Sequence, residues 1–273
     1  MAIITFSREL AALGDETAHE LASQLNYRFV DRNAVENRIK SFGVAERKLE
    51  KFDERKPSFW SSFSQDRDDY LHFLKTAILA EAVQGNCILI GRGASVILKD
   101  VPGVLSVFLT ASPDVRIERV KSYFHCDDRR ARQVLEQADR DREGFHRYFF
   151  DVKWKEVSNY HLTLNTGHLH PEACAEIIKF MKGRIISGQA EEQNTVRVRE
   201  LALGLQVKHH ILYEKKAAIH FLEASAEGNK ITLYGVANSQ SLAEMAVAAA
   251  KEIAAGREIC SEIQVVQEYN IMP

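Results

Sequence analysis

The first thirty residues combine a short apolar run with an amphipathic stretch. Ile3 to Phe6 is an apolar run typical of a buried strand, and Ser7 to Asp15 predicts a loop. Glu16 to Leu25 repeats apolar residues at i, i+3, i+4 and i+7, which predicts an amphipathic helix. Because a helix N-terminus presents backbone N–H groups to anions, this order indicates a phosphate-binding loop.

Further apolar runs alternate with helical patterns. The predicted strands are Arg28–Val30, Cys87–Ile90, Val104–Leu109 and His161–Leu164. This alternation predicts an α/β fold over residues 1–186, a three-layer arrangement with a parallel sheet between two layers of helices. Since ligands bind beyond the carboxyl ends of parallel strands, the loops after the strands become the candidate site.

The pattern changes after residue 186. Residues 187–195 (SGQAEEQNT) are polar and lack a period, which predicts a linker. Residues 196–273 predict a second, smaller α/β domain. Its expected elements are helices over 197–213 and 242–255 and strands over 218–224, 230–236 and 261–268, with a turn at Glu227 to Asn229.

Composition and charge exclude several classes. The chain has 273 residues, 45% of them hydrophobic, and a formal net charge of −2, so it has no basic field that would bind nucleic acid. No secretory pattern or long apolar run supports export or membrane insertion. Four widely spaced cysteines without a C-x-x-C pair fit reduced thiols and a cytoplasmic location.

The first loop, SRELAALGDE, departs from G-x-x-x-x-G-K-[ST], since it lacks the motif's two glycines, its lysine and its hydroxyl residue. Arg8 and Gly14 remain and could hold an anion together with the helix N-terminus. The alternative is a solvated Arg8–Glu9 pair, with Gly14 serving a turn. Asp15 stands where a hydroxyl would ligate Mg²⁺, and its charge opposes a polyphosphate.

Two further groups of residues follow strands or fill helices. The segment Gly91-Arg92-Gly93 directly follows the strand at 87–90. Its glycines would let the backbone come close to a ligand, and its arginine could bind phosphate. The alternative is a tight turn with Arg92 in solvent. A later span is rich in arginines that could clamp a transferred phosphoryl group or form a solvated, salt-bridged helix. These are Arg116, Arg119, Arg129, Arg130, Arg132, Arg140, Arg142 and Arg147, interleaved with Asp127, Asp128, Asp139 and Asp141.

Three other features leave alternatives open. Asp31 either contacts a nucleoside or caps the helix that follows it. His168 and His170 have no third ligand nearby, so no protein metal site is predicted. Trp60 either covers a pocket or anchors a packed loop.

The motifs just described, taken in order, resemble the cytidylate kinase-like family, relatives of bacterial (d)CMP kinase among the P-loop nucleoside monophosphate kinases. The resemblance covers Met1 to Lys182. It rests on IITFSRE, YRFVDRNAVE, DERKPSF, CILIGRGASVILKDVPGVLSVFLTASPDVRIERV, ADRDREGFHRYF and NYHLTLNT.

The resemblance implies that ATP, with Mg²⁺, binds the first loop and that CMP, dCMP or a similar nucleoside monophosphate accepts the phosphoryl group. In this reading the catalytic residues are Arg8, Arg116, Asp139 and Arg142, and the nucleotide-binding residues are Gly14, Asp31, Gly91, Arg92 and Gly93. Asn165 and Thr166 fall on the family's closing strand end. The chain departs from the family where loop glycines become Ala11, Ala12 and Leu13, and where His161 replaces an acid.

The second unit resembles a BON domain through GNKITLYGVANSQSLAEMAVAAAKEIAAGREICSEIQVV. Such domains are linked with lipid or ligand association; an intramolecular regulatory role, or a dimerising role that makes a homo-oligomer, fits this chain better. Three functions follow as hypotheses. They are a nucleotide kinase, a non-catalytic nucleotide sensor, and a scaffold whose activity lies in the BON-like unit.

Overall fold

The computed structural model describes residues 1–44, 46 and 64–266, so the DERKPSF motif and Trp60 lie outside the described residues. The chain forms two compact units, Met1–Thr195 and Val196–Pro273. Within the described parts of the chain, no helix is both long enough and apolar enough to cross a bilayer.

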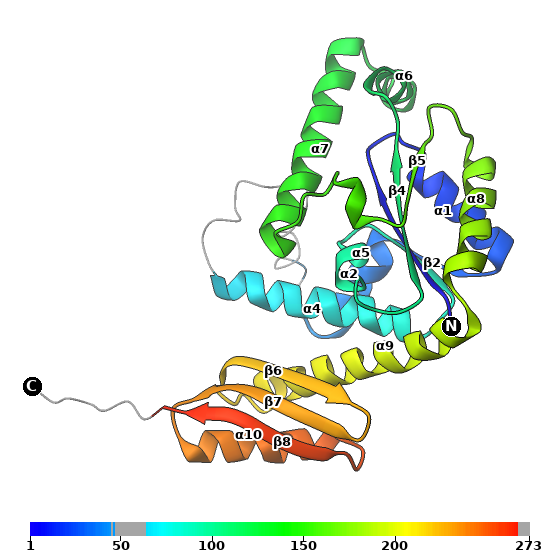
Figure 1. Ribbon diagram of the computed structural model, residues 1–273. Coiled ribbons are helices and arrows are strands. Elements are labelled where there is room, and N and C mark those ends of the chain that lie inside the picture. Colours follow the sequence, from blue (N-terminus) through cyan, green and yellow to red (C-terminus); the bar gives the residue numbers. More distant parts are fainter. Residues whose placement is uncertain (45, 47–63, 267–273) are drawn as a thin grey trace, which may run out of the picture. The chain divides into compact units, whose positions relative to one another are not determined.

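A five-stranded parallel sheet forms the centre of the first unit, in the order β2-β3-β1-β4-β5 (Figure 1). Its strands are β1 (Ile3–Arg8), β2 (Arg28–Val30), β3 (Cys87–Ile90), β4 (Val104–Thr110) and β5 (Leu162–Asn165). Every neighbouring pair is parallel, so the carboxyl ends of all five strands meet at one edge. The α/β class predicted from the sequence is confirmed.

Helices cover both faces of this sheet, with α1 and α8 on one side and α4 and α5 on the other (Figure 1). The helices are α1 (Gly14–Leu25), α2 (Arg32–Ser41), α4 (Ser64–Val83), α5 (Ala94–Ile97), α6 (Pro113–Phe124), α7 (Asp128–Phe150) and α8 (Pro171–Ile185), and a 3₁₀ turn spans Val157–Asn159. Because both faces are covered, β3 is buried at each of its positions, as its unbroken apolar run requires.

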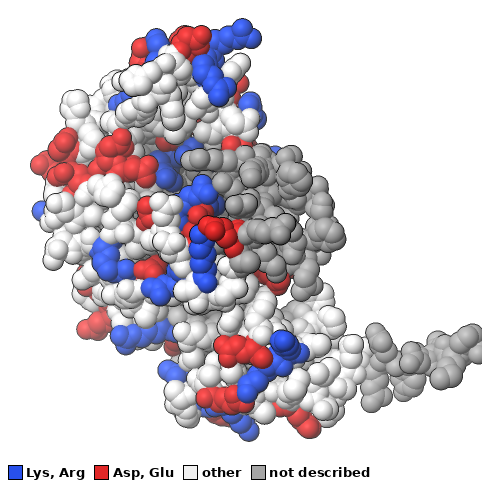
Figure 2. All heavy atoms as spheres, turned by 180° about the vertical axis from the view of Figure 1, so that it is seen from behind, with Lys and Arg blue, Asp and Glu red and all other residues white. Residues whose placement is uncertain are grey.

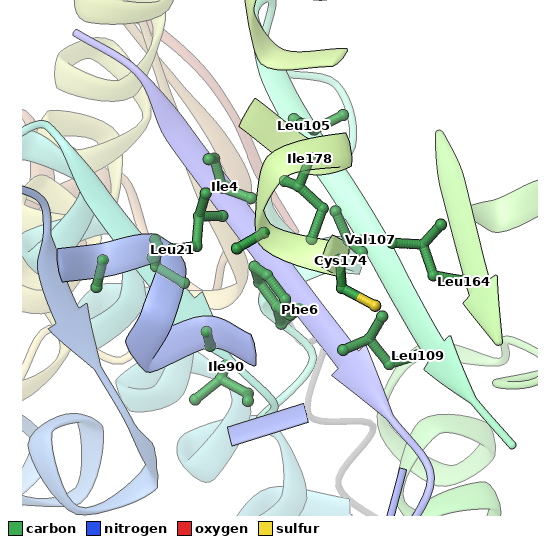
Figure 3. Packing of buried hydrophobic residues seen from close by; sticks show 14 of the residues in the cluster. Ile4, Phe6, Leu21, Ile90, Leu105, Val107, Leu109, Leu164, Cys174 and Ile178 are labelled. Carbon is green, nitrogen blue, oxygen red and sulfur yellow. The ribbon is translucent and has the colours of Figure 1, made fainter. Parts of the chain in front are cut away.

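The core between the sheet and α1 and α8 is apolar throughout (Figure 3). Ile4 and Phe6 of β1 are buried against Leu21 of α1 and Ile178 of α8. Cys174 lies in the same cluster, and burial raises the pKa of its thiol. All four cysteines of the chain are free thiols. This packing fixes α1, and with it the loop that joins β1 to α1.

The second unit is a three-stranded sheet, in the order β6-β7-β8, packed against helices. Its elements are helix α9 (Gly188–His209, which begins in the first unit), a π-helical turn (His210–Glu214), β6 (His220–Glu227), β7 (Lys230–Ala237), α10 (Gln240–Ile253) and β8 (Glu258–Val265). β6 and β7 form an antiparallel hairpin, and β7 and β8 are parallel. Gly228 turns the hairpin with a φ of 55°.

The predicted linker over 187–195 is wrong, because α9 begins at Gly188. Asn194 and Val198 are both fully buried and stand four residues apart, so they lie on one helix face. The period becomes visible only when the polar window is read together with the residues after it. Glu191 of this helix also pairs with the N-terminal ammonium at 3.5 Å. Along the chain, the boundary between the two units falls after Thr195, within the residues of α9.

Gly204 of α9 provides a test of packing in the second unit. A Cβ at this position would lie 2.3 Å from the carbonyl oxygen of Ala224 in β6. We expect Gly204→Ala to destabilise the unit by about 1–3 kcal/mol, since the helix must move from the strand. Gly183→Ala in α8, where a Cβ meets nothing within 4 Å, is the control and should be neutral or stabilising. Denaturant unfolding measures both, and an unchanged G204A midpoint would contradict the packing.

Candidate phosphate-binding site

The loop between β1 and α1 keeps a glycine-like backbone without glycines. Ala11 has a φ of 60° and Leu13 a φ of 52°, both in the left-handed region. A non-glycine residue there costs about 1–2 kcal/mol. Such strain persists only when surrounding contacts fix the backbone.

Two arginines of α6 supply those contacts. Arg116 Nε donates to the carbonyl oxygen of Leu10 at 2.8 Å, and Arg119 Nη1 donates to that of Ala11 at 3.0 Å. Arg119 Nη2 also donates to the carbonyl oxygen of Thr166, just after β5, at 2.7 Å. As their i, i+3 spacing predicts, both arginines reach the same loop. Hydrogen bonds from α6 therefore fix the carbonyl groups of Leu10 and Ala11 in the first loop.

Arg8, Gly14 and Gly91 lie together. A Cβ on Gly14 would come within 2.4 Å of Arg8 Cγ, and one on Gly91 within 2.6 Å of Arg8 Nη1. Arg8 Nη2 donates to Asp15 Oδ1 at 3.3 Å, so its carboxylate partner is Asp15, whereas Glu9 pairs elsewhere. Arg8 Nε is buried without a hydrogen-bond partner. The two glycines therefore provide space for the Arg8 side chain.

Glu9, Arg116, Asp139 and Lys155 form a network of alternating charge beside the loop. Arg116 contacts Glu9 Oε1 at 3.1 Å and Asp139 Oδ1 at 2.7 Å. Lys155 Nζ donates to Glu9 Oε1 at 2.6 Å and to Asp139 Oδ2 at 2.8 Å. Thr110 Oγ1, at the end of β4, donates to the second Glu9 oxygen. The structure thus brings Arg116 and Asp139 together and adds Glu9 and Lys155, which the sequence reasoning missed.

Each ionised group of this network stabilises the charged form of its neighbours. Burial disfavours the charged form of Asp139, but hydrogen bonds from Arg116 and Lys155 outweigh burial and lower the pKa of its carboxyl. Burial likewise disfavours the charged form of Lys155, while Asp139 and Glu9 raise the pKa of its ammonium above the usual value. Asp139 and Lys155 are therefore both ionised at neutral pH.

The Gly91-Arg92-Gly93 turn holds its arginine inside the unit. All three residues are left-handed, with φ values of 77°, 52° and 69°. Arg92 is 3% exposed, pairs with Glu36 of α2, and lies 5.8 Å from the centre of the Phe145 ring. The alternative of a solvent-exposed Arg92 is therefore wrong. At Gly93 a Cβ would meet Phe150 at 2.3 Å, so only glycine fits.

Asp31 and Arg142, the other two predicted residues, have described contacts with residues outside this network. Asp31 caps α2 by accepting from Ala34 N at 2.8 Å. Arg142 Nη1 donates to the carbonyl oxygen of Ala138 at 3.4 Å, while Asp139 pairs with Arg116 and Lys155. The i, i+3 spacing of Asp139 and Arg142 therefore does not translate into an ion pair.

His161 stands where the resembling family has an acid, and it has a structural contact. His161 Nδ1 accepts from Ser106 N at 3.1 Å, and the ring nitrogen lies 2.7 Å from Ser106 Oγ. Because the amide nitrogen of Ser106 can only donate, Nδ1 is the unprotonated nitrogen. The residue ties β4 to the start of β5.

A hollow of about 550 Å³ opens between the end of α7 and the segment after it. Most of its lining residues are charged, and Trp154 and Val152 are the apolar ones. The lining residues are Glu143, Arg147, Asp151, Val152, Lys153, Trp154, Lys155 and Glu156. Lys155 therefore belongs both to this hollow and to the charge network at the first loop.

Charge is mixed on the face shown in Figure 2, where Lys and Arg lie interspersed with Asp and Glu in both units. Within the described ranges, no three His, Cys, Asp or Glu side chains are placed to hold a metal ion.

A parallel sheet in this order, with a loop and helix after its central strand and cations around that loop, defines a P-loop kinase-like fold. The chain belongs to the cytidylate kinase-like family, whose model matches residues 3–168. The BON domain model matches residues 202–267, which lie in the second unit.

A cytidylate kinase from Sulfolobus acidocaldarius is 36% identical over 75 residues, which are 27% of this chain and 41% of that protein. The match thus spans about two fifths of the relative's length. The crystal structure of an uncharacterized protein from Eubacterium ventriosum superposes with a TM-score of 0.55 at 19% identity, over 67% of this chain and 98% of that chain. This likeness supports the fold alone.

The strain in the first loop is measurable. Ala11→Gly removes the left-handed penalty and only one methyl group, so we expect the free energy of unfolding to rise by about 1 kcal/mol. Ala80→Gly, the same exchange inside α4, is the control and should lower it by about 1 kcal/mol. Urea unfolding measures both variants. Equal destabilisation by the two would show that Ala11 is not strained.

The network also predicts an acid dependence of stability. Since the folded-state pKa of Asp139 is lowered, its contribution is complete above the unfolded value near 4 and is lost as pH falls through the folded value. Asp139→Asn should therefore lower the free energy of unfolding at pH 7 and flatten its dependence on pH below about pH 4. Unfolding titrations at each pH test this, and an unchanged slope would contradict it.

Proposed function

We propose that the first unit binds the polyphosphate of ATP at the first loop and transfers the terminal phosphoryl group to a nucleoside monophosphate such as CMP or dCMP. The observation that carries the proposal is that four cations from three separate segments meet at one short loop. These are Arg8 of β1, Arg116 and Arg119 of α6, and Lys155 after α7. The family membership of the chain agrees with this chemistry.

The side chains present fit a triphosphate. Gly14 leaves space for the aliphatic part of Arg8 and Gly91 for its guanidinium, and Arg8 Nε is a buried donor without a partner. Mg²⁺ commonly reaches such sites bound to nucleotide phosphates and one or two carboxylates. Asp15, which is 58% exposed in the first turn of α1 and pairs with Arg8, is one carboxylate that would contact such an ion once Arg8 binds phosphate.

In this proposal the residues around the loop and the Gly91–Gly93 turn have different roles. Arg116 and Arg119 hold the loop backbone, so the N–H groups at the start of α1 keep their direction toward an anion. Arg92, oriented by Glu36 and Phe145, would bind the acceptor phosphate at the end of the neighbouring strand. Mg²⁺ with the nucleotide would neutralise charge on the transferred group. Asp31, a helix cap here, would support the acceptor side through α2.

Activity is tested by ADP release from Mg-ATP with a panel of nucleoside monophosphates. We expect turnover with a pyrimidine acceptor, and a loss of about 2–4 kcal/mol of transition-state stabilisation in Arg92→Ala, which removes the guanidinium assigned to the acceptor phosphate. Arg184→Ala in α8 is a matched control that should keep full activity. No ADP release above background with any acceptor would rule out the kinase.

A sensor is the second candidate, and one observation favours it. Asp15 already pairs with Arg8, and Glu9 with Arg116 and Lys155, so an incoming phosphate competes with carboxylates of the protein itself. Such competition suits weak binding without turnover. Calorimetry that detects ATP binding in the absence of ADP release would select the sensor, with the second unit as its reporter. Failure to bind any nucleotide would exclude both functions.

A further inference from the structure

We propose that Lys155 supplies the phosphate-binding ammonium that the first loop itself lacks. The inference rests on the proposed function, because it names a residue that would contact the triphosphate. The loop SRELAALGDE contains no lysine, and the arginines of α6 are occupied with its carbonyl groups. A compact cation for the phosphates must therefore come from another segment.

The position of Lys155 meets this need. Its Nζ lies 2.6 Å from Glu9 Oε1, and Glu9 directly follows β1. The ammonium therefore lies at the start of the first loop. Trp154, the preceding residue, is 1% exposed, and its carbonyl oxygen accepts from Tyr160 Oη at 2.8 Å. The backbone that carries Lys155 is thus anchored.

Lys155 is also the member of the network that can engage a ligand. Its side chain is 47% exposed and lines the hollow, whereas that of Arg116 is 5% exposed. An ammonium has three N–H donors, and the described contacts with Glu9 and Asp139 use two of them. The third can bind a phosphate oxygen.

The two carboxylates do not depend on Lys155. Arg116 pairs with both Glu9 and Asp139, and Thr110 donates to Glu9. If the ammonium turns toward a phosphate, each carboxylate keeps a cationic partner. The lysine on its flexible stem can therefore follow a ligand at little cost, whereas the buried Arg116 cannot.

The test compares ATP with AMP by calorimetry in the full chain. Lys155→Met should weaken ATP binding about ten- to hundredfold and change AMP binding less than about twofold, since the lost contact is a charge-assisted bond to the outer phosphates. Lys155→Arg should restore most of the ATP affinity. Lys153→Met, an exposed lysine that lines the same hollow, is the control and should bind both nucleotides as the wild type does.

Every other outcome of this comparison overturns either the inference or the proposed function. Unchanged ATP affinity in K155M, with a wild type that binds ATP, overturns the inference and leaves the proposed function standing. Equal weakening of ATP and AMP, with a lower unfolding midpoint, shows a merely structural lysine and also overturns it. A wild type that binds neither nucleotide overturns the proposed function itself. Should K155M fail to fold, Lys155→Gln, which keeps hydrogen-bonding groups without the charge, gives the same ATP-to-AMP comparison.

Discussion

The candidate site depends on the interactions of one buried group, the guanidinium of Arg116. It binds the Leu10 carbonyl oxygen, the Glu9 carboxylate and the Asp139 carboxylate at once. Removing one member of a buried ion network leaves an unpaired charge, which costs several kcal/mol. The geometry of the first loop, the position of α7 and the placement of Lys155 therefore all depend on one side chain of α6.

This arrangement explains how the loop keeps its backbone conformation with so little glycine. In a glycine-rich loop the backbone reaches left-handed conformations at little steric cost. Here Ala11 and Leu13 adopt those conformations, and hydrogen bonds from Arg116 and Arg119 to the loop carbonyls hold them. Glu9 and Asp15 meanwhile neutralise the surrounding cations. Carboxylates thus already pair with Arg8, Arg116 and Lys155, and the proposed triphosphate would have to displace Asp15 to reach the Arg8 guanidinium.

The sequence predicted the strands closely because buried parallel strands are unbroken apolar runs; Cys87–Ile90 matches the observed β3. It failed at 187–195, where the helical period extends beyond the polar window. The sequence pattern also did not predict contacts between residues that are far apart along the chain. Nothing local indicates that Lys155 meets Glu9, 146 positions away, or that Arg92 is buried under Phe145. Such pairings arise from the topology, which places loops of separate strands at one edge.

The most direct measurement is a crystal structure with a non-hydrolysable ATP analogue. The account predicts that the phosphates lie against the loop from Glu9 to Gly14, that Arg8 exchanges Asp15 for a phosphate oxygen, and that the Arg116 contacts to the loop remain. A loop closed by the Leu13 side chain, with the analogue bound elsewhere or absent, would contradict it.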